Sequence, residues 1–301
     1  MTYQPRLFVP AITPFKPDLS VDTERFVAHS RLLLADGADG LACFGTTSEA
    51  NSMSVAERMD ALEALVAAGI PAARLIPGTG CSALPDTIAL TQHAVSLGCM
   101  GTLTLPPFFY KPLSDDALFA SFASVIEAVG SDKLRLYLYH IPQMTGVPIT
   151  LGVIERLLKA YPTTIAGLKD SSGNWDNTAS VIAAFPQIES YSASESLIVK
   201  NVQAGGAGCI SASANVNVAG IMALIRGLGT PQEADLLARV GAIRSLFEKI
   251  PLIPGIKATV AARLDDPGYA IVRPPLVAIG PAHHDQITNA KSLCFEGVSS
   301  V

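Results

Sequence analysis

Charged residues, cysteines and long hydrophobic runs are all scarce in this sequence, and each shortage excludes a class of protein. Only 16% of the 301 residues are charged and the net charge is -5, which argues against the basic stripe of a nucleic-acid-binding protein. No apolar run reaches about 18 residues, so we expect no membrane-spanning helix. The first residues lack the basic and apolar regions of a signal peptide, and we therefore expect a cytoplasmic protein.

The cysteines and histidines are too scattered to indicate a disulfide framework or a metal site. The five cysteines are odd in number and include no Cys-x-x-Cys pair, which favours reduced thiols. They are Cys43, Cys81, Cys99, Cys209 and Cys294. The five histidines show no ligand spacing either, so we predict no metal ion.

Short apolar runs, each ending in a polar or Gly/Pro turn, recur along the chain. Several are apolar throughout and hold β-branched or aromatic residues, which is typical of strands buried on both faces of a parallel sheet. The predicted strands span residues 7–13, 40–44, 74–78, 101–105, 134–140, 164–169, 188–193 and 208–212.

Stretches with helical spacing lie between these runs. Residues 54–68 begin with a Ser-Val-Ala-Glu capping box and place apolar side chains on one face. The other predicted helices span residues 22–36, 82–97, 114–129, 151–160, 175–185, 195–204 and 215–227. Eight repeats of strand then helix predict an α/β protein, a (β/α)8 TIM barrel. A doubly wound sheet is the alternative, but no Gly-x-Gly-x-x-Gly follows the first strand.

The remainder of the chain also has helical spacing, at residues 231–249, at 255–264 and near the end. No low-complexity linker separates this part from the barrel. We therefore predict a barrel over residues 1–230 and, over 231–301, C-terminal helices packed on it.

Lys169 ends the sixth predicted strand, after the apolar run Ile165-Ala166-Gly167-Leu168. Active sites of such barrels lie at the carboxyl ends of the strands. Apolar surroundings disfavour the ammonium form of a lysine, and the free amine can attack a ketone to form a Schiff base. The alternative is a structural ion pair with Asp170 or another carboxylate nearby.

Tyr139 ends the adjacent strand, and Gly45-Thr46-Thr47 follows the second strand. A phenol at this position can relay protons if a hydroxyl such as that of Thr46 holds it. The alternative is a core tyrosine with its hydroxyl satisfied. The two threonines can offer hydroxyls and backbone N–H groups to a carboxylate, or they can simply cap a helix.

Five motifs along nearly the whole chain resemble one family in order. They are F-G-T-T-S-E-A, I-P-G-T-G, Y-H-I-P-Q-M-T-G, G-L-K-D-S-S-G and G-C-I-S-A-S-A-N-V. Together they resemble the dihydrodipicolinate synthase and N-acetylneuraminate lyase family, the class I pyruvate-dependent aldolases. The combination is specific, whereas no single motif would be.

The resemblance implies a role for each matching residue. Lys169 would form the Schiff base with pyruvate or another 2-keto acid, and Tyr139 would relay protons while coupled to Thr46. Thr47, with its backbone, would hold the substrate carboxylate, and Ile210 would place a backbone carbonyl near the keto acid. Because the imine is the electron sink, neither a metal nor an organic cofactor is implied. The family is usually a homotetramer, a dimer of dimers, in which a loop aromatic reaches into a neighbour's site.

Departures from the family pattern bear on which substrate is bound. Met144 stands where dihydrodipicolinate synthases commonly carry an arginine, and a thioether cannot replace a bidentate carboxylate clamp. Phe109 stands at the family's loop tyrosine, with Tyr110 next to it, and His140 replaces an asparagine. His140, Met144 and Tyr110 are therefore predicted substrate-binding positions, as is Gly45. His140 as a plain packing residue is the alternative.

The leading hypothesis is a Schiff-base lyase that acts through Lys169 on pyruvate or 2-keto-3-deoxy sugar acids, by an aldol step or a dehydration. One alternative is a 4-hydroxy-tetrahydrodipicolinate (dihydrodipicolinate) synthase, which condenses pyruvate with aspartate semialdehyde. An alternative of another class is a non-catalytic barrel that binds keto acids.

Overall fold

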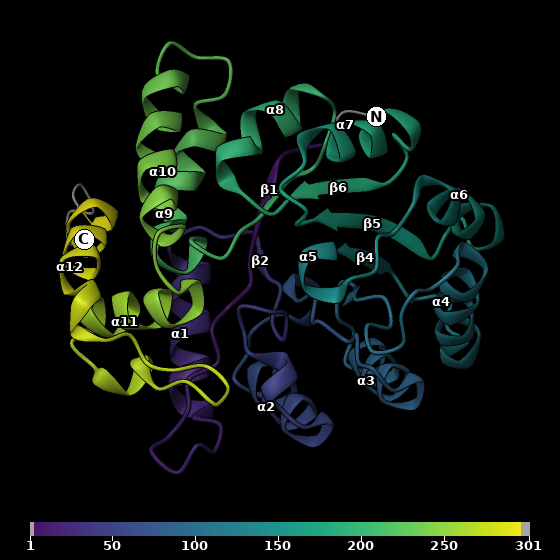
Figure 1. The fold of residues 1–301 in the computed structure, drawn as a ribbon, viewed down its shortest axis with the longest axis horizontal. Coiled ribbons are helices and arrows are strands. Elements are labelled where there is room, and N and C mark those ends of the chain that lie inside the picture. Colours follow the sequence, from purple (N-terminus) through teal and green to yellow (C-terminus); the bar gives the residue numbers. More distant parts are fainter. Residues whose placement is uncertain (1–2, 296–301) are drawn as a thin grey trace.

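A parallel sheet curls into a barrel, as the strand pattern predicts (Figure 1). The computed structural model describes residues 3–295. The strands are β1 (Arg6–Val9), β2 (Gly40–Leu41), β3 (Thr102–Thr104), β4 (Leu136–His140), β5 (Ile165–Asp170), β6 (Glu189–Ser192) and β7 (Gly208–Ile210). They are ordered β2-β1-β7-β6-β5-β4-β3, and every pair is parallel.

The third predicted strand closes the barrel without forming a regular ladder. Its segment makes isolated parallel bridges from Leu75 to Leu41 and from Gly78 to Leu103. Pro77 lies between these bridges and has no backbone N–H to donate, although its carbonyl accepts from Leu103 at 2.9 Å. The interrupted segment therefore joins β2 to β3 and completes the TIM barrel.

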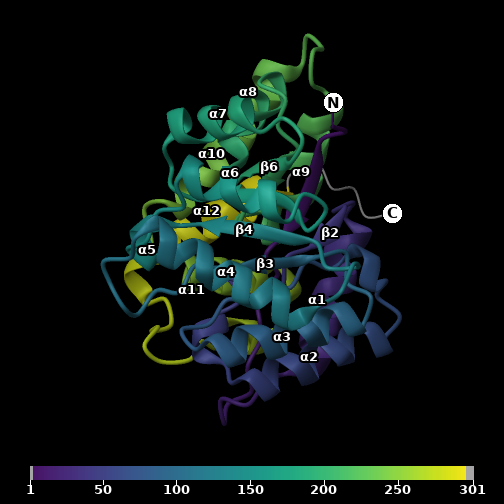
Figure 2. The ribbon, with the colours of Figure 1, turned by 90° about the vertical axis from the view of Figure 1, so that its right-hand side faces the viewer.

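Helices surround the strands on the outside of the barrel (Figures 1 and 2). They are α1 (Thr23–Ala35), α2 (Val55–Ala67), α3 (Leu84–Ser96), α4 (Asp115–Val129), α6 (Leu151–Ala160), α7 (Trp175–Ala184), α8 (Ile198–Gln203) and α9 (Ala214–Arg226). The capping box that begins α2 is present in both directions, because Ser54 and Glu57 bond to each other's backbone N–H. The predicted helix at 195–204 is instead a 3-10 turn, Glu195–Leu197, followed by the short α8.

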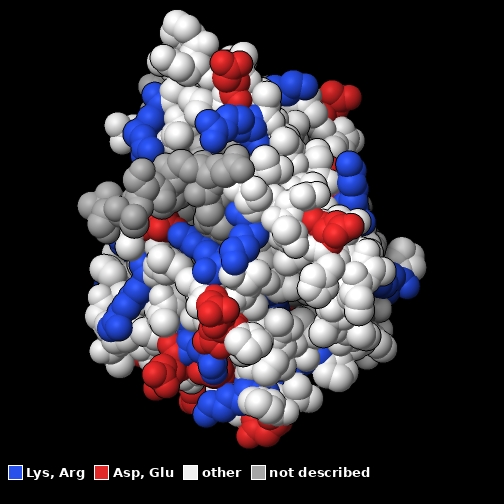
Figure 3. All heavy atoms as spheres, turned by 90° about the vertical axis from the view of Figure 1, so that its left-hand side faces the viewer, with Lys and Arg blue, Asp and Glu red and all other residues white. Residues whose placement is uncertain are grey.

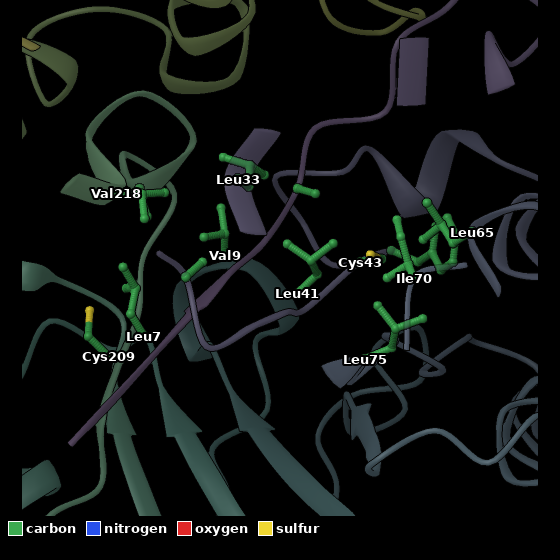
Figure 4. Packing of buried hydrophobic residues seen from close by; sticks show 14 of the residues in the cluster. Leu7, Val9, Leu33, Leu41, Cys43, Leu65, Ile70, Leu75, Cys209 and Val218 are labelled. Carbon is green, nitrogen blue, oxygen red and sulfur yellow. The ribbon is translucent and has the colours of Figure 1, made fainter. Parts of the chain in front are cut away.

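The layer between strands and helices holds an extensive buried cluster. Leu7 and Val9 of β1 pack in it with Leu33 of α1 and Val218 of α9 (Figure 4). The opposite side chains of the strands fill the barrel itself, where Phe8 and Tyr191 make an edge-to-face contact with ring centroids 5.6 Å apart.

A polar cluster closes the amino-terminal end of the barrel interior. The hydroxyls of Tyr137 and Tyr191 both donate to Glu189 Oε2 at 2.9 Å, and Arg6 pairs with the same carboxylate. Burial raises the pKa of both tyrosines, and the Glu189 charge raises it further. These phenols therefore stay protonated, and chemistry is left to the other end of the barrel.

Three C-terminal helices complete the described chain: α10 (Glu233–Phe247), α11 (Leu252–Leu264) and α12 (His284–Phe295). They lie together beside α9 and α1 (Figure 1). Phe247 and Ile256 share a buried cluster with Ile12 and Val216 of the barrel. The exact domain division at residue 230 stays a prediction, and residues 296–301 lie outside the described chain.

Charges of both signs lie on one face of the molecule. On the face that Figure 3 shows, blue Lys and Arg side chains adjoin red Asp and Glu side chains, and no basic stripe runs across it. No helix within residues 3–295 is long and apolar enough to span a membrane.

Candidate active site

The strand register places three residues side by side on the interior face of the barrel. Tyr139 of β4, Lys169 of β5 and Tyr191 of β6 are register partners across adjacent strands. Since side chains alternate along a strand, their neighbours His140 and Asp170 point to the opposite face, towards the helices. The apolar run into Lys169 thus carries its amine to the carboxyl end of the barrel.

Lys169 is buried and bonds to a phenol rather than to a carboxylate. Only 4% of the residue is exposed. Its Nζ donates to Tyr139 Oη at 3.3 Å and lies 4.4 Å from the ring centroid. The ion pair with Asp170 is not formed, because that carboxylate accepts from Asn177 and Thr178 side chains at 2.8 Å each.

Tyr139 is held from two sides. Its hydroxyl lies 3.2 Å from Thr46 Oγ1, in addition to its bond with Lys169. Burial alone would raise its pKa, but the charge of Lys169 and hydrogen bonds from Thr46, Lys169 and Ser171 outweigh burial and lower the pKa. A phenol that releases its proton more readily than usual, beside an amine, has the geometry of a proton relay.

The loop after β2 packs closely against the third strand segment. A Cβ on Gly78 would collide with the backbone of Phe44, so glycine is needed for this approach. Gly45, Thr46 and Tyr139 line one small cavity. Thr47 is buried just beyond them. A second cavity of about 410 Å³ is lined by residues of α11, α12 and the segment between them, and Lys169 does not line it.

Ile210 and the carboxylate of Glu195 lie at the ends of neighbouring strands. Ile210 ends β7 and is buried in the barrel interior. Glu195 follows β6, is fully buried and accepts from the hydroxyls of Ser211 and Ser213, while Arg244 Nη1 lies 3.9 Å away. Glu195 closely follows the seventh predicted strand in the sequence, but no role was predicted for it.

The remaining predicted positions do not join Lys169 within one chain. His140 Nδ1 accepts from Ile149 N at 3.1 Å, and burial lowers the pKa of its ring although Asp170 opposes the shift. Met144 is 68% exposed, on the short helix α5 (Pro142–Thr145). Tyr110 is 79% exposed in the loop after β3. His140 thus has a packing environment, whereas Met144 and Tyr110 face solvent.

The family model and the most similar relatives indicate the same protein family for this chain. The model of the "Dihydrodipicolinate synthetase family" matches residues 4–292. An "Uncharacterized DapA-like lyase" of Chloroflexus aurantiacus is 38% identical over 276 residues, covering 91% of this chain and 92% of the relative. A 4-hydroxy-tetrahydrodipicolinate synthase of Rhizobium meliloti is 31% identical over 278 residues, covering 91% and 93%.

Solved structures agree in fold. The dihydrodipicolinate synthase of Agrobacterium tumefaciens superposes with a TM-score of 0.87 at 32% identity, covering 96% of this chain and 99% of its own. A catalytic lysine mutant of Ruminococcus gnavus sialic acid aldolase gives 0.88 at 17% identity, covering 97% and 96%. The second likeness concerns the fold alone.

Proposed function

Because the chain belongs to the dihydrodipicolinate synthetase family and is a class I lyase, we propose that Lys169 forms a Schiff base with pyruvate or a related 2-keto acid. The observation that carries the proposal is the buried contact of Lys169 with Tyr139, itself bonded to Thr46. A barrel that only bound keto acids would have no need of this amine–phenol–hydroxyl chain.

The proposed reaction begins when the Lys169 amine attacks the ketone carbon and water is lost, leaving a protonated imine. The imine accepts the electron pair released when a proton leaves the neighbouring carbon, which gives an enamine. The enamine then adds to an aldehyde, and cleavage is the reverse; elimination of a hydroxyl from a 2-keto-3-deoxy acid is the dehydration. Tyr139 would move the protons, and no cofactor is needed.

The substrate carboxylate is proposed to bind at the loop after β2. Gly45, Thr46 and Thr47 would offer backbone N–H groups, with the Thr47 hydroxyl beside them. The carbonyl of Ile210 would lie on the other side of the keto acid. These positions are supported by their common place at the carboxyl ends of β2 and β7.

We propose that the part of the substrate that faces Met144 carries no carboxylate. In dihydrodipicolinate synthases an arginine at this position commonly binds the carboxylate of the aldehyde substrate. Met144 on α5 offers an exposed thioether in place of that arginine. A neutral aldehyde or a 2-keto-3-deoxy sugar acid fits this rim. Condensation of pyruvate with aspartate semialdehyde stays the second candidate, because a relative 31% identical is named 4-hydroxy-tetrahydrodipicolinate synthase.

A cytoplasmic homotetramer, a dimer of dimers, is proposed as the working form. Phe109 and Tyr110 are 71% and 79% exposed and stack edge to face, an apolar pair that a partner chain would cover. One of these rings would then reach the neighbour's site. Reduced thiols agree with the proposed compartment.

Borohydride reduction in the presence of pyruvate, followed by peptide mass analysis, tests the Schiff base. We expect one pyruvyl adduct, on Lys169, and Lys169→Ala should lose both the adduct and turnover. Absence of the adduct from the wild-type protein would falsify the proposal. Assays with 2-keto-3-deoxy acids, N-acetylneuraminate and aspartate semialdehyde then separate the candidate substrates.

A further inference from the structure

A buried ion pair joins the loop after β2 to α11. Glu49 Oε1 and Lys257 Nζ lie 2.5 Å apart, with side chains 1% and 0% exposed. The ammonium also donates to Thr13 O at 2.8 Å and lies 4.4 Å from the centroid of the Phe15 ring. Desolvation offsets most of the attraction within such a pair, so stability alone is a weak reason for it.

The Glu49 carboxylate favours the charged form of Lys257. Burial lowers the pKa of Lys257 to about 8, while the charge and hydrogen bond of Glu49 oppose the shift and Arg273 adds to it. Loss of the carboxylate would therefore favour a neutral amine, and loss of the amine would leave a buried, unpaired carboxylate.

Arg273 extends the contact of the C-terminal segment with the same loop. Its backbone N–H donates to Glu49 Oε2 at 3.0 Å, and its guanidinium donates to Ser52 O at 2.7 Å and pairs with Glu57 of α2. The guanidinium carbon also lies 4.4 Å from the Phe15 ring centroid. The loop is thus held at Glu49 and Ser52 by residues distant in sequence.

The anchored carboxylate lies three residues from Thr46. Glu49 has a φ of 57°, a conformation that a side chain rarely adopts without such contacts, and its N–H donates to Thr46 O at 3.1 Å. Thr13 Oγ1 donates to Ser48 O at 2.8 Å in the same loop. The Thr46 hydroxyl then reaches Tyr139 at 3.2 Å.

We propose that Glu49 and Lys257 are positioning residues, whose ion pair fixes the loop so that Thr46 holds Tyr139 beside Lys169. The inference rests on the proposed Schiff-base function and adds a role for α11 in it. Lys169 itself is positioned by β5, which the pair does not touch. Loss of the pair should therefore impair proton transfer more than imine formation.

The double variant Glu49→Gln/Lys257→Met removes both charges while keeping the size of the side chains, which avoids an unpaired buried ion. Exchange of the pyruvate methyl protons with deuterium, followed by NMR, reports proton transfer without a second substrate. We expect its kcat to fall at least about tenfold, since small misplacements of a catalytic group have effects of this size. The pyruvate concentration that gives half-maximal exchange, and the yield of the borohydride adduct on Lys169, should change far less than kcat.

Asp266→Asn is the matched control. It breaks the 2.8 Å ion pair with Arg25, which also joins the C-terminal segment to the barrel but does not touch the loop after β2. Exchange should stay at the wild-type rate. If the double variant does not fold, Glu49→Asp, which keeps the charge but shortens the side chain, should show the same loss of kcat.

Wild-type exchange in the folded double variant, or in folded Glu49→Asp, overturns the positioning role. An equal loss in Asp266→Asn also overturns it, because the effect would then be general loosening. Absence of a Lys169 adduct from the wild-type protein instead removes the proposed function, so the two failures are distinguishable.

Discussion

The Tyr139 hydroxyl joins the Lys169 amine to the Thr46 hydroxyl in the proposed proton relay. Tyr139→Phe keeps the ring beside Lys169 Nζ but removes both hydrogen bonds of the hydroxyl. Since general acid–base groups contribute roughly 10²–10⁴-fold, we expect kcat to fall by that factor while the borohydride adduct still forms. Steady-state kinetics and adduct mass measure the two effects. Wild-type turnover in this variant would assign proton transfer to another group.

His29 is a buried residue whose titration should affect stability but not chemistry. Its Nε2 lies 3.0 Å from Asn215 Oδ1, and burial lowers its pKa from 6.5 to about 4 despite that bond, with Arg263 adding to the shift. The unfolded chain therefore binds a proton that the folded chain does not, and stability is lost as the pH falls from 6.5 towards 4.

The size of this effect is roughly 3 kcal/mol at most. Thermal unfolding from pH 7 to pH 4 measures it, and His29→Gln should flatten the acid limb of the Tm profile. An acid limb as steep in the variant as in the wild type would show that other groups dominate.

At the scale of single elements, the sequence predicted those helix ends and strands that depend on interactions between residues close together in the chain. Ser54 and Glu57 marked the start of α2 because their capping bonds are made within four residues. The apolar run before Lys169 predicted β5. Because side chains alternate between the two faces of a strand, the lysine and its register partner Tyr139 then lie on one face. Both are short-range consequences of sequence.

Other elements depended on partners that no local pattern reveals. Lys257 lies in the mostly apolar helix α11, and its partner Glu49 is 208 residues away. The short helix α5 was not predicted, since its four residues, Pro142–Thr145, are too few to show a periodicity. These elements follow from tertiary packing, which sequence periodicity does not encode.

The start of α4 offers a test of helix capping that leaves the active site untouched. Ser114 Oγ accepts from Ala117 N at 3.2 Å, so Ser114→Ala should lower the free energy of unfolding by about 1 kcal/mol. Ser124 bonds to a carbonyl within the same helix, and Ser124→Ala should change it by only a few tenths. Denaturant unfolding compares them, and equal losses would contradict a capping role.

For the whole molecule, the exposed aromatic pair at the loop after β3 should determine assembly. Burial of Phe109 and Tyr110 against a neighbour would remove two large apolar side chains from water, and each contributes about 1.5–3 kcal/mol when buried. The variant Phe109→Ser/Tyr110→Ser should therefore dissociate at concentrations where the proposed wild-type tetramer stays assembled. Sedimentation velocity measures this directly.

Turnover should fall together with assembly, because the neighbour's site loses the aromatic that the proposed tetramer supplies. Val277 is 78% exposed on the C-terminal segment, and Val277→Ser serves as the control, with tetramer and turnover unchanged. A variant that stays tetrameric but loses turnover would assign the aromatic pair to the site alone. A variant that dissociates with full turnover would show that each barrel works independently of its neighbours.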